Sequence, residues 1–545
     1  MDNTPVAAPV GVAGDTEIVT DKRRQRLILV AMITALTAVV ASVSGLNVAQ
    51  QDLALDLGAS QSQLLWIING YTMALAALLM PIGAIGDRWG RKPVLVAGLG
   101  LFLVANLGAA LATTTTMLLI ARVAAGAAAA MIMPVTLSVI TSSFPADERP
   151  RAVGIWSGFA GAGGILGLFV SSFLIDRVSW PWLFAMPLVF AATSLAMTTA
   201  YVGNSREHAE GGFDVLGSLL SALAIGGLVL GIHEGPEQGW THPLALGGIV
   251  IGAVSLIAFI AYELRTDHPL IDLRVFTNRE LATGSTVLTV VFAVMMGLML
   301  VLVQFLQAVA GYSALKAAAG LLPMALVMMP LSSIAPTIAA RVGLRRTLIT
   351  GATAFVIGLA LLASMVSVDG GYWSILPGLL VMASGIGLLM SPSTTAITGS
   401  LPEENQGVAS ALNDTVREFG GAVGIALLGS ILNAGYRSSV SSATGDLAPD
   451  LAHQVEEGIG SAYAAAQDLG QQAPAVLGAA REALVDGWRV SMWVGVGMAL
   501  VTLAVIVWRA PRRADESSTV AVADLDCELT GLTELTPAAA TSTAG

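Results

Sequence analysis

The chain has 545 residues, of which 55% are hydrophobic and only 12% are charged, and its formal net charge is -11. This composition and a mean hydropathy of +0.76 exclude an ordinary water-soluble protein, so we expect most of the chain to lie in lipid. The single cysteine, Cys527, lies in a polar carboxyl-terminal stretch, which excludes an intrachain disulfide and a thiolate metal cluster.

Apolar segments of about 20 residues, the length that a helix needs to cross a hydrocarbon core, recur along the whole chain. The sequence therefore predicts an all-α polytopic membrane protein with fourteen transmembrane helices. The predicted spans are residues 27–48, 63–85, 93–111, 117–140, 152–175, 182–202, 216–233, 244–262, 282–308, 317–340, 347–366, 373–396, 407–432 and 490–507. The first segment lacks a signal-peptide cleavage pattern, so we interpret it as a retained span.

The basic residues between the spans favour one orientation, because short cytoplasmic loops carry an excess of lysine and arginine. With the amino terminus inside, few loop cations fall on the opposite side, among them Arg177, Lys316, Arg437 and Arg481. We therefore expect both termini in the cytoplasm and the chain in the cell (plasma) membrane. The polar stretches 1–26 and 509–545 lack an apolar pattern and are expected to be disordered cytoplasmic tails.

One outer connection, residues 436–486, is much longer than the others and is rich in alanine. Its partly helical pattern predicts an external helical hairpin or cap. A disordered loop is the alternative, because acidic sequence rich in alanine and glycine can stay solvated.

A turn rich in glycines and cations follows the second span. Its sequence is Gly83-Ala-Ile-Gly-Asp87-Arg88-Trp-Gly90-Arg91-Lys92. Glycines permit a tight turn, Asp87 can cap a helix, and the cations suit an inner membrane surface. A degenerate copy at residues 340–346 follows the tenth span without the aspartate, which indicates an internal repeat.

This turn strongly resembles the loop signature of the major facilitator superfamily. With the fourteen spans, the segment Arg122-Val-Ala-Ala-Gly126 and the acidic thirteenth span, it makes the chain similar to the superfamily's fourteen-helix drug:proton antiporter branch of multidrug efflux transporters. The resemblance implies two six-helix bundles, residues 27–202 and 282–508, and two additional helices within residues 203–281. It also implies that the turn is a conformational-switch loop, whose charge pairs and helix-dipole contacts break during alternating access.

The chain departs from that branch in its amino-terminal half. Where many members have an aspartate in the first span, this chain has Ser42 and Asn47, and the second span has Asn69 where some relatives have another. Arg122 is thus left without its usual partner. It is expected to bond these polar groups or carbonyls, to attract an anionic substrate group, or to reach Glu418 in one state.

The antiporter signature of the fifth span is also altered, with Leu168 in place of its proline and Ser171-Ser172 in place of paired glycines. This change weakens the expectation of antiport by the branch's common route.

The thirteenth span carries Asp414, Arg417 and Glu418, although a charge at the bilayer centre costs about 2.5–3.5 kcal/mol. Both carboxylates lie on one helix face, and Arg417 can reach Asp414 at i,i+3. We predict an internal Asp414–Arg417 pair and assign proton coupling to Glu418 first and Asp414 second, since burial favours a neutral carboxyl group. A purely structural ion pair is the alternative. The resemblance implies that both acidic positions contribute to cation recognition.

Polar, aromatic and thioether side chains near a central cavity are the candidate substrate contacts. They are Ser42, Asn47, Trp66, Asn69, Tyr71, Met295, Gln304, Gln307, Asp414 and Glu418.

The leading hypothesis is a proton-coupled secondary exporter of hydrophobic, often cationic drugs that confers antibiotic resistance. One alternative is an exporter of a lipid, a fatty acid or an endogenous metabolite, which an Arg122 without its aspartate favours. Another is a non-transporting membrane sensor or scaffold, which the altered antiporter signature favours. The sequence has no P-loop or catalytic-triad pattern, so no enzyme is expected.

We expect no cofactor, metal site or nucleic-acid partner. The expected partners are small hydrophobic or cationic substrates, protons and the lipid bilayer, and the chain is expected to act as a monomer.

Overall fold

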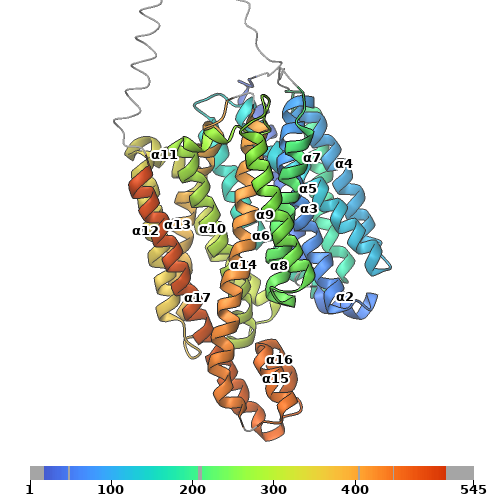
Figure 1. Cartoon of the computed structure of the whole chain (residues 1–545), viewed down its shortest axis with the longest axis vertical. Helices are drawn as coiled ribbons and strands as arrows, with labels where there is room; N and C mark the ends of the chain where they lie inside the picture. The colour runs from blue at the N-terminus through green and yellow to red at the C-terminus, as the bar shows by residue number, and fades with distance from the viewer. Residues whose placement is uncertain (1–17, 47–48, 206–211, 403–404, 446, 511–545) are drawn as a thin grey trace, which may run out of the picture.

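The computed structural model describes residues 18–46, 49–205, 212–402, 405–445 and 447–510. This part of the chain is helical, and fourteen of its helices are long and apolar enough to cross a membrane, which confirms the predicted fold class. The helices run side by side, and the described chain ends lie at one end of the molecule (Figure 1). We call this end the terminal face and the opposite end, which carries α15 and α16, the hairpin face.

The first bundle contains six spans and a short helix between the first two. Its elements are α1 (Lys22–Gly45), α2 (Gln50–Leu57), α3 (Gln61–Trp89), α4 (Arg91–Ala110), α5 (Thr115–Ser143), α6 (Arg149–Ile175), and η1 (Trp180–Phe184), which continues into α7 (Ala185–Tyr201). The additional helices are α8 (Val215–Gln238) and α9 (Pro243–Glu263).

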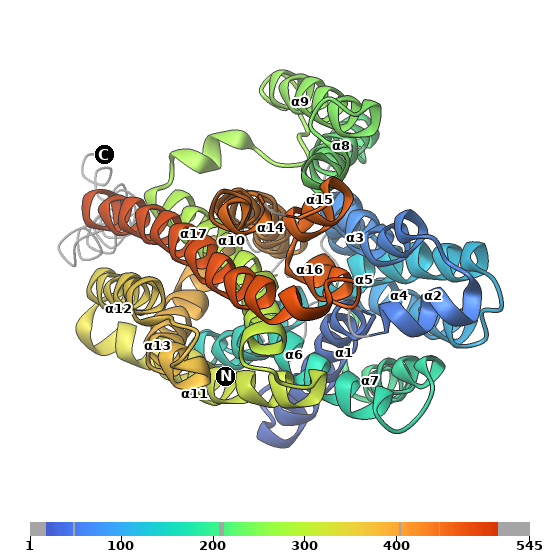
Figure 2. The ribbon, with the colours of Figure 1, turned by 90° about the horizontal axis from the view of Figure 1, so that it is seen from below.

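The second bundle follows the short 3-10 helix η2. Its elements are η2 (Leu273–Thr277), α10 (Arg279–Gln304), the π-helical turn η3 (Phe305–Val309), α11 (Ala314–Val342), α12 (Leu344–Met365), α13 (Gly371–Gly399), α14 (Gln406–Thr444), α15 (Pro449–Glu457), α16 (Ile459–Ala465), η5 (Gly470–Gln472) and α17 (Ala473–Arg509). Seen along the helices, the two bundles lie side by side, with α8 and α9 outside them next to α3 (Figure 2).

Local sequence sets where several spans begin. Ser60 and Gln63 form a reciprocal capping box at the start of α3, and the side chains of Thr114 and Asp214 accept from first-turn N–H groups of α5 and α8. Gly90 has a φ of 107°, a conformation that favours glycine, and makes the turn between α3 and α4.

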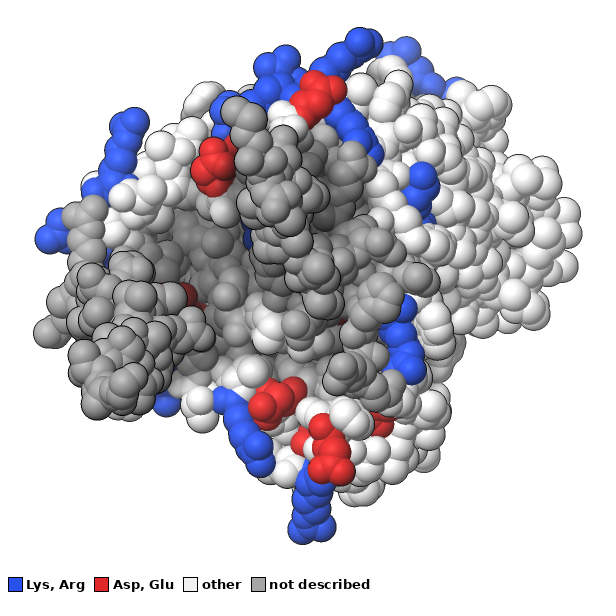
Figure 3. Space-filling model, turned by 90° about the horizontal axis from the view of Figure 1, so that it is seen from above, with Lys and Arg blue, Asp and Glu red and all other residues white. Residues whose placement is uncertain are grey.

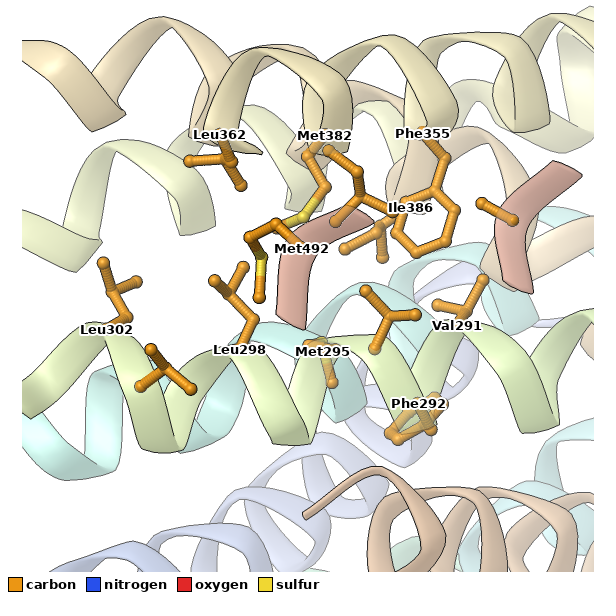
Figure 4. Packing of buried hydrophobic residues seen from close by; sticks show 14 of the residues in the cluster. Val291, Phe292, Met295, Leu298, Leu302, Phe355, Leu362, Met382, Ile386 and Met492 are labelled. Carbon is orange, nitrogen blue, oxygen red and sulfur yellow. The ribbon is translucent and has the colours of Figure 1, made fainter. Parts of the chain in front are cut away.

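Glycines let α14 approach α10 closely, which is how helices associate in lipid. A Cβ atom on Gly420 would lie 2.3 Å from the carbonyl oxygen of Thr289, and one on Gly424 would lie 1.8 Å from that of Ala293. Only glycine therefore fits at these two positions. On the other side of α10, apolar side chains such as Leu298, Met382 and Met492 form the packed core of the second bundle (Figure 4).

The helix α8 contacts both bundles. Val229 lies in one apolar cluster with Ala76 of α3 and Ala422 of α14, and Ile225 packs against this cluster. The additional helices thus cover the seam between α3 and α14 on one side of the molecule.

The long connection is helical, the first of the two forms expected for it. The helix α14 continues to Thr444, well beyond the predicted end at residue 432, and α17 begins at Ala473 instead of at residue 490. Between them α15 and α16 form a small hairpin. Tyr463 of α16 donates a hydrogen bond to the carbonyl oxygen of Ala308 at 2.7 Å and accepts one from Arg481, which ties the hairpin to the second bundle.

Candidate functional site

On the terminal face, the switch loop joins the two bundles through Asp87. Its carboxylate accepts hydrogen bonds from the backbone N–H groups of Gly407 at 2.8 Å and Val408 at 3.1 Å, at the amino-terminal end of α14. The N–H groups of a helix start carry partial positive charge, so a carboxylate there is stabilising. Arg91 donates to Asp87 at 3.0 Å, and Gly83 lies so close to α14 that a Cβ atom would meet Gly407 at 2.6 Å.

The other residues of the switch loop face the first bundle or a surface cavity. Lys92 donates to the carbonyl oxygen of Thr199 at 3.1 Å. Arg88 and Asp87 line a cavity of about 720 Å³ together with residues from the connection between α9 and α10, including His268 and Asp272. The cavity adjoins the Asp87 contact, so this loop, the connection and the start of α14 meet at one place.

The ion pair predicted in α14 is present in the first third of that helix, which runs from Gln406 to Thr444. Arg417 donates to Asp414 Oδ1 at 3.3 Å, and Asn413 donates to the same oxygen at 3.1 Å. Asp414 and Arg417 are buried, whereas Glu418 is half-buried. Within the described residues, Asp414 Oδ2 and Arg417 Nε have no hydrogen-bond partner, so this pair rests on a single long contact.

Arg417 also lies against two aromatic rings. Its Cζ atom is 4.4 Å from the centroid of the Phe292 ring and 5.3 Å from that of the Trp156 ring, which are cation–π distances. Phe292 belongs to α10, but Trp156 belongs to α6 in the other bundle. Neither aromatic residue was among the sequence candidates.

Arg122 takes its partners from the first bundle. It donates to Ser42 Oγ at 3.0 Å and to the carbonyl oxygen of Ile67 at 3.3 Å, and its guanidinium lies 4.3 Å from the ring centroid of Tyr71. Of the partners considered from the sequence, the structure thus gives it Ser42 and a carbonyl. Asn47 lies outside the described residues. Arg122 Nη2 has no partner among the described residues.

Glu418 is close enough to both arginine clusters to act on them electrostatically. Its charge acts on Tyr71 of the first bundle and on Arg417 of the second. Tyr71 itself is buried and donates to the carbonyl oxygen of Val39 at 3.1 Å. The half-buried carboxyl group of Glu418 thus interacts with groups of both bundles.

The remaining candidates are spread more widely. Trp66 and Asn69 are half-buried in α3, Gln304 is half-buried at the end of α10, and Gln307 is exposed in η3. Met295 is 2% exposed and lies in the packed core of the second bundle, near Leu298 in Figure 4. This placement gives Met295 packing partners and does not support a substrate contact.

Among the groups that sequence reasoning missed are Trp156 and Phe292, which lie against Arg417, and Asn106, which accepts from Ser42 at 3.4 Å. Each lies in a different span from the group that it contacts. A signal was present for Trp156, since it is the single tryptophan of its glycine-rich span. Within the described ranges, no three His, Cys, Asp or Glu side chains gather so that they could hold a metal ion.

Two bundles of membrane-spanning helices with charged side chains buried inside them are features of membrane transporters. The family model of the Major Facilitator Superfamily matches residues 30–425, and the chain belongs to this superfamily.

Three curated relatives are named for resistance or efflux. The chain is 29% identical over 413 residues to the multidrug resistance protein Stp of Mycobacterium tuberculosis, covering 76% of each chain. It is 29% identical over 490 residues to the methyl viologen resistance protein SmvA of Salmonella typhimurium, covering 89% of this chain and 98% of the relative. It is 30% identical over 455 residues to the multidrug efflux pump LfrA of Mycolicibacterium smegmatis, covering 83% and 89%.

Solved structures share the fold at low identity. The human organic anion transporter MFSD10 aligns with a TM-score of 0.58 at 13% identity, covering 90% of this chain and all of the other. The proton:xylose symporter XylE aligns with a TM-score of 0.56 at 14% identity, covering 89% and 95%. These likenesses show the major facilitator fold alone.

Proposed function

We propose that the protein is a proton-coupled exporter of hydrophobic, often cationic compounds that works by alternating access. Similarity to multidrug and methyl viologen resistance proteins supports export of drug-like compounds. The protein acts as a secondary transporter in the plasma membrane, with both termini in the cytoplasm. Lysine and arginine side chains around the terminal face support this orientation (Figure 3).

The observation that carries the proposal is the charge balance in the first third of α14. Two carboxyl groups, Asp414 and Glu418, share one basic residue, Arg417, within a membrane-spanning helix. The carboxyl group left over must be neutralised, because an unpaired charge in the membrane is costly. A proton can do this, and so can an organic cation. Since both compete for the same group, binding one releases the other.

Such an exchange has enough driving force for export. One proton exchanged for one monovalent cation moves no net charge, so each pH unit supplies about 1.4 kcal/mol, which supports a tenfold substrate gradient. A second proton per cycle adds about 2.3 kcal/mol for each 100 mV of membrane potential.

The contact of Asp87 with α14 supports the switching part of the proposal. It joins the bundles on the terminal face, which is the cytoplasmic face in the proposed orientation. Opening toward the cytoplasm must separate Asp87 from the start of α14. The switch loop therefore acts as a lock that holds the inner side closed.

The export of an anionic lipid or metabolite receives less support. Arg122, the group that would attract an anion, is buried and directs its guanidinium to Ser42, the Ile67 carbonyl and the ring of Tyr71. These contacts hold the guanidinium of Arg122 inside the first bundle. The half-buried group at the centre is the carboxyl group of Glu418, which suits a cation.

Liposomes containing the purified protein test this function. Efflux of tetraphenylphosphonium is measured with and without a pH gradient for the wild type, Glu418→Gln and Asp414→Asn. We expect gradient-driven efflux in the wild type and its loss in Glu418→Gln, because the amide cannot bind a proton. Glu234→Gln is the matched control, since Glu234 is also buried but lies in α8 and bonds Gln238. Full coupling in both α14 variants would overturn the assignment of the proton site.

A further inference from the structure

The two rings around Arg417 form an enclosure built by both bundles. Phe292 comes from α10 and Trp156 from α6, and both side chains are buried. The indole N–H of Trp156 donates to Thr136 Oγ1 at 3.1 Å, which fixes the orientation of this ring. Arg417 is therefore a cation held between one aromatic face of each bundle.

Apart from the two rings, Arg417 has few polar contacts. Its ion pair with Asp414 is a single contact of 3.3 Å, and its Nε has no hydrogen-bond partner among the described residues. A bidentate pair would hold a guanidinium far more firmly. The aromatic faces thus supply much of what keeps Arg417 in place, and these faces bind any cation, not only a guanidinium.

The cation in the enclosure is the chain neighbour of the carboxyl group that the proposed function uses. Glu418 follows Arg417 in the chain, is half-buried, and its charge acts on Arg417. Aromatic faces next to a carboxylate are the chemical environment that recognises an organic cation, because ring and carboxylate both favour positive charge.

We propose that Trp156 and Phe292 form a recognition subsite for the exported organic cation, and that Arg417 occupies this subsite when no substrate is bound. The inference rests on the proposed function and deepens it. An entering lipophilic cation displaces Arg417 from the rings and takes its place. A neutral compound of the same shape gains no such interaction, so the subsite selects for positive charge.

Phe292 belongs to the buried apolar cluster of the second bundle, so its replacement also removes packing. Figure 4 shows its ring on the side of α10 that faces away from Met382 and Met492. The test must therefore separate a lost cation partner from lost packing.

Binding of a matched pair of probes to the purified full chain tests the subsite. Isothermal titration compares tetraphenylphosphonium with neutral triphenylphosphine oxide, which shares its phenyl groups but not its charge. In Trp156→Leu and in Phe292→Leu we expect the Kd of the cation to rise about tenfold, while that of the neutral probe changes less than about twofold.

Control variants separate a lost π face from lost packing. Trp156→Phe and Phe292→Tyr keep an aromatic face and should bind the cation nearly as the wild type does. Phe355→Leu removes a buried ring from α12, in the core of the second bundle, and should affect both probes equally. Equal losses for the two probes in the Trp156→Leu and Phe292→Leu variants, or no loss, would overturn the subsite. Failure of the wild type to bind or export the cation would instead contradict the proposed function.

If the leucine variants do not yield monodisperse protein, the Arg417→Lys variant tests the displacement of Arg417 by the substrate. Lysine keeps the charge but stacks less well on aromatic rings, so it should compete less with the substrate. We expect the Kd of tetraphenylphosphonium to fall about threefold. An unchanged or weaker affinity would contradict the displacement of Arg417.

Discussion

Arg122 and Arg417 are both buried in the membrane region, but among the described residues only Arg417 has a carboxylate within ion-pair distance. Instead of a carboxylate, Arg122 has a hydroxyl group, a carbonyl oxygen and the ring of Tyr71 as its partners. A buried charge that loses a partner is costly, because no water replaces the lost hydrogen bond. The few neutral contacts of Arg122 therefore contribute to the stability of the first bundle.

Replacing Ser42 with alanine should reveal this dependence. We expect Ser42→Ala to lower the free energy of unfolding by about 1.5–3 kcal/mol, because the lost hydrogen bond is made to a charged group. Thermal unfolding in detergent measures the change. Ser194→Ala is the control, since buried Ser194 donates only to a neutral carbonyl, that of Ala31. If both variants lose the same stability, Ser42 has no special role beside Arg122.

The sequence could predict contacts within one helix but not those between helices. Asp414 and Arg417 are three residues apart, so helical geometry alone brought them together. Trp156 and Phe292 reach Arg417 only because α6 and α10 pack against α14, and no spacing in the sequence records that. Likewise, Asp87 was expected to cap a helix, but only the fold identifies that helix as α14.

At the scale of the helix, α14 meets two structural requirements that conflict in a membrane, namely close helix packing and the burial of charged groups. Its glycines give close packing against α10, while its charged residues require an internal site away from lipid. Close packing holds the backbone of α14 against α10 and thereby sets the position of Glu418. An added side chain at the contact should move the carboxyl group as well as weaken the packing.

Gly424→Ala tests this coupling between packing and position. The new Cβ atom would lie 1.8 Å from the carbonyl oxygen of Ala293, so α14 must shift away from α10. We expect a fall in unfolding free energy of about 1–3 kcal/mol, and gradient-driven efflux that is lost even in the molecules that remain folded. Gly497→Ala in α17 has no atom within 4 Å of the added carbon and should leave both measurements nearly unchanged. Normal efflux in Gly424→Ala would contradict the coupling.

For the whole molecule, the contact between the bundles on the terminal face depends strongly on one carboxylate. Asp87 bonds two N–H groups of α14 and one arginine of its own bundle. Since these N–H groups have no partner within their own helix, a charged acceptor stabilises them more than a neutral one does. The state with the bundles joined here should therefore lose population when the charge is removed.

Spin labels can follow this population. We expect Asp87→Asn to lengthen the distance between labels on cysteines at the exposed positions Trp89 and Val342, in a background without Cys527. Pulsed electron paramagnetic resonance measures the distance distribution. Asp272→Asn is the control, because Asp272 caps only the short helix η2. An unchanged distribution in Asp87→Asn would show that other contacts hold this face together.

The helix α8 covers the seam between the two bundles, which move relative to one another in the proposed transport cycle. Its contact with both bundles consists of hydrocarbon side chains, including Ala76, Val229 and Ala422. Dispersion forces between methyl groups have no preferred direction, so the surfaces of α8 and of the bundles can slide past one another while water stays excluded. The helices α8 and α9 can thus keep lipid tails out of the interface between the two bundles without resisting the relative motion of the bundles.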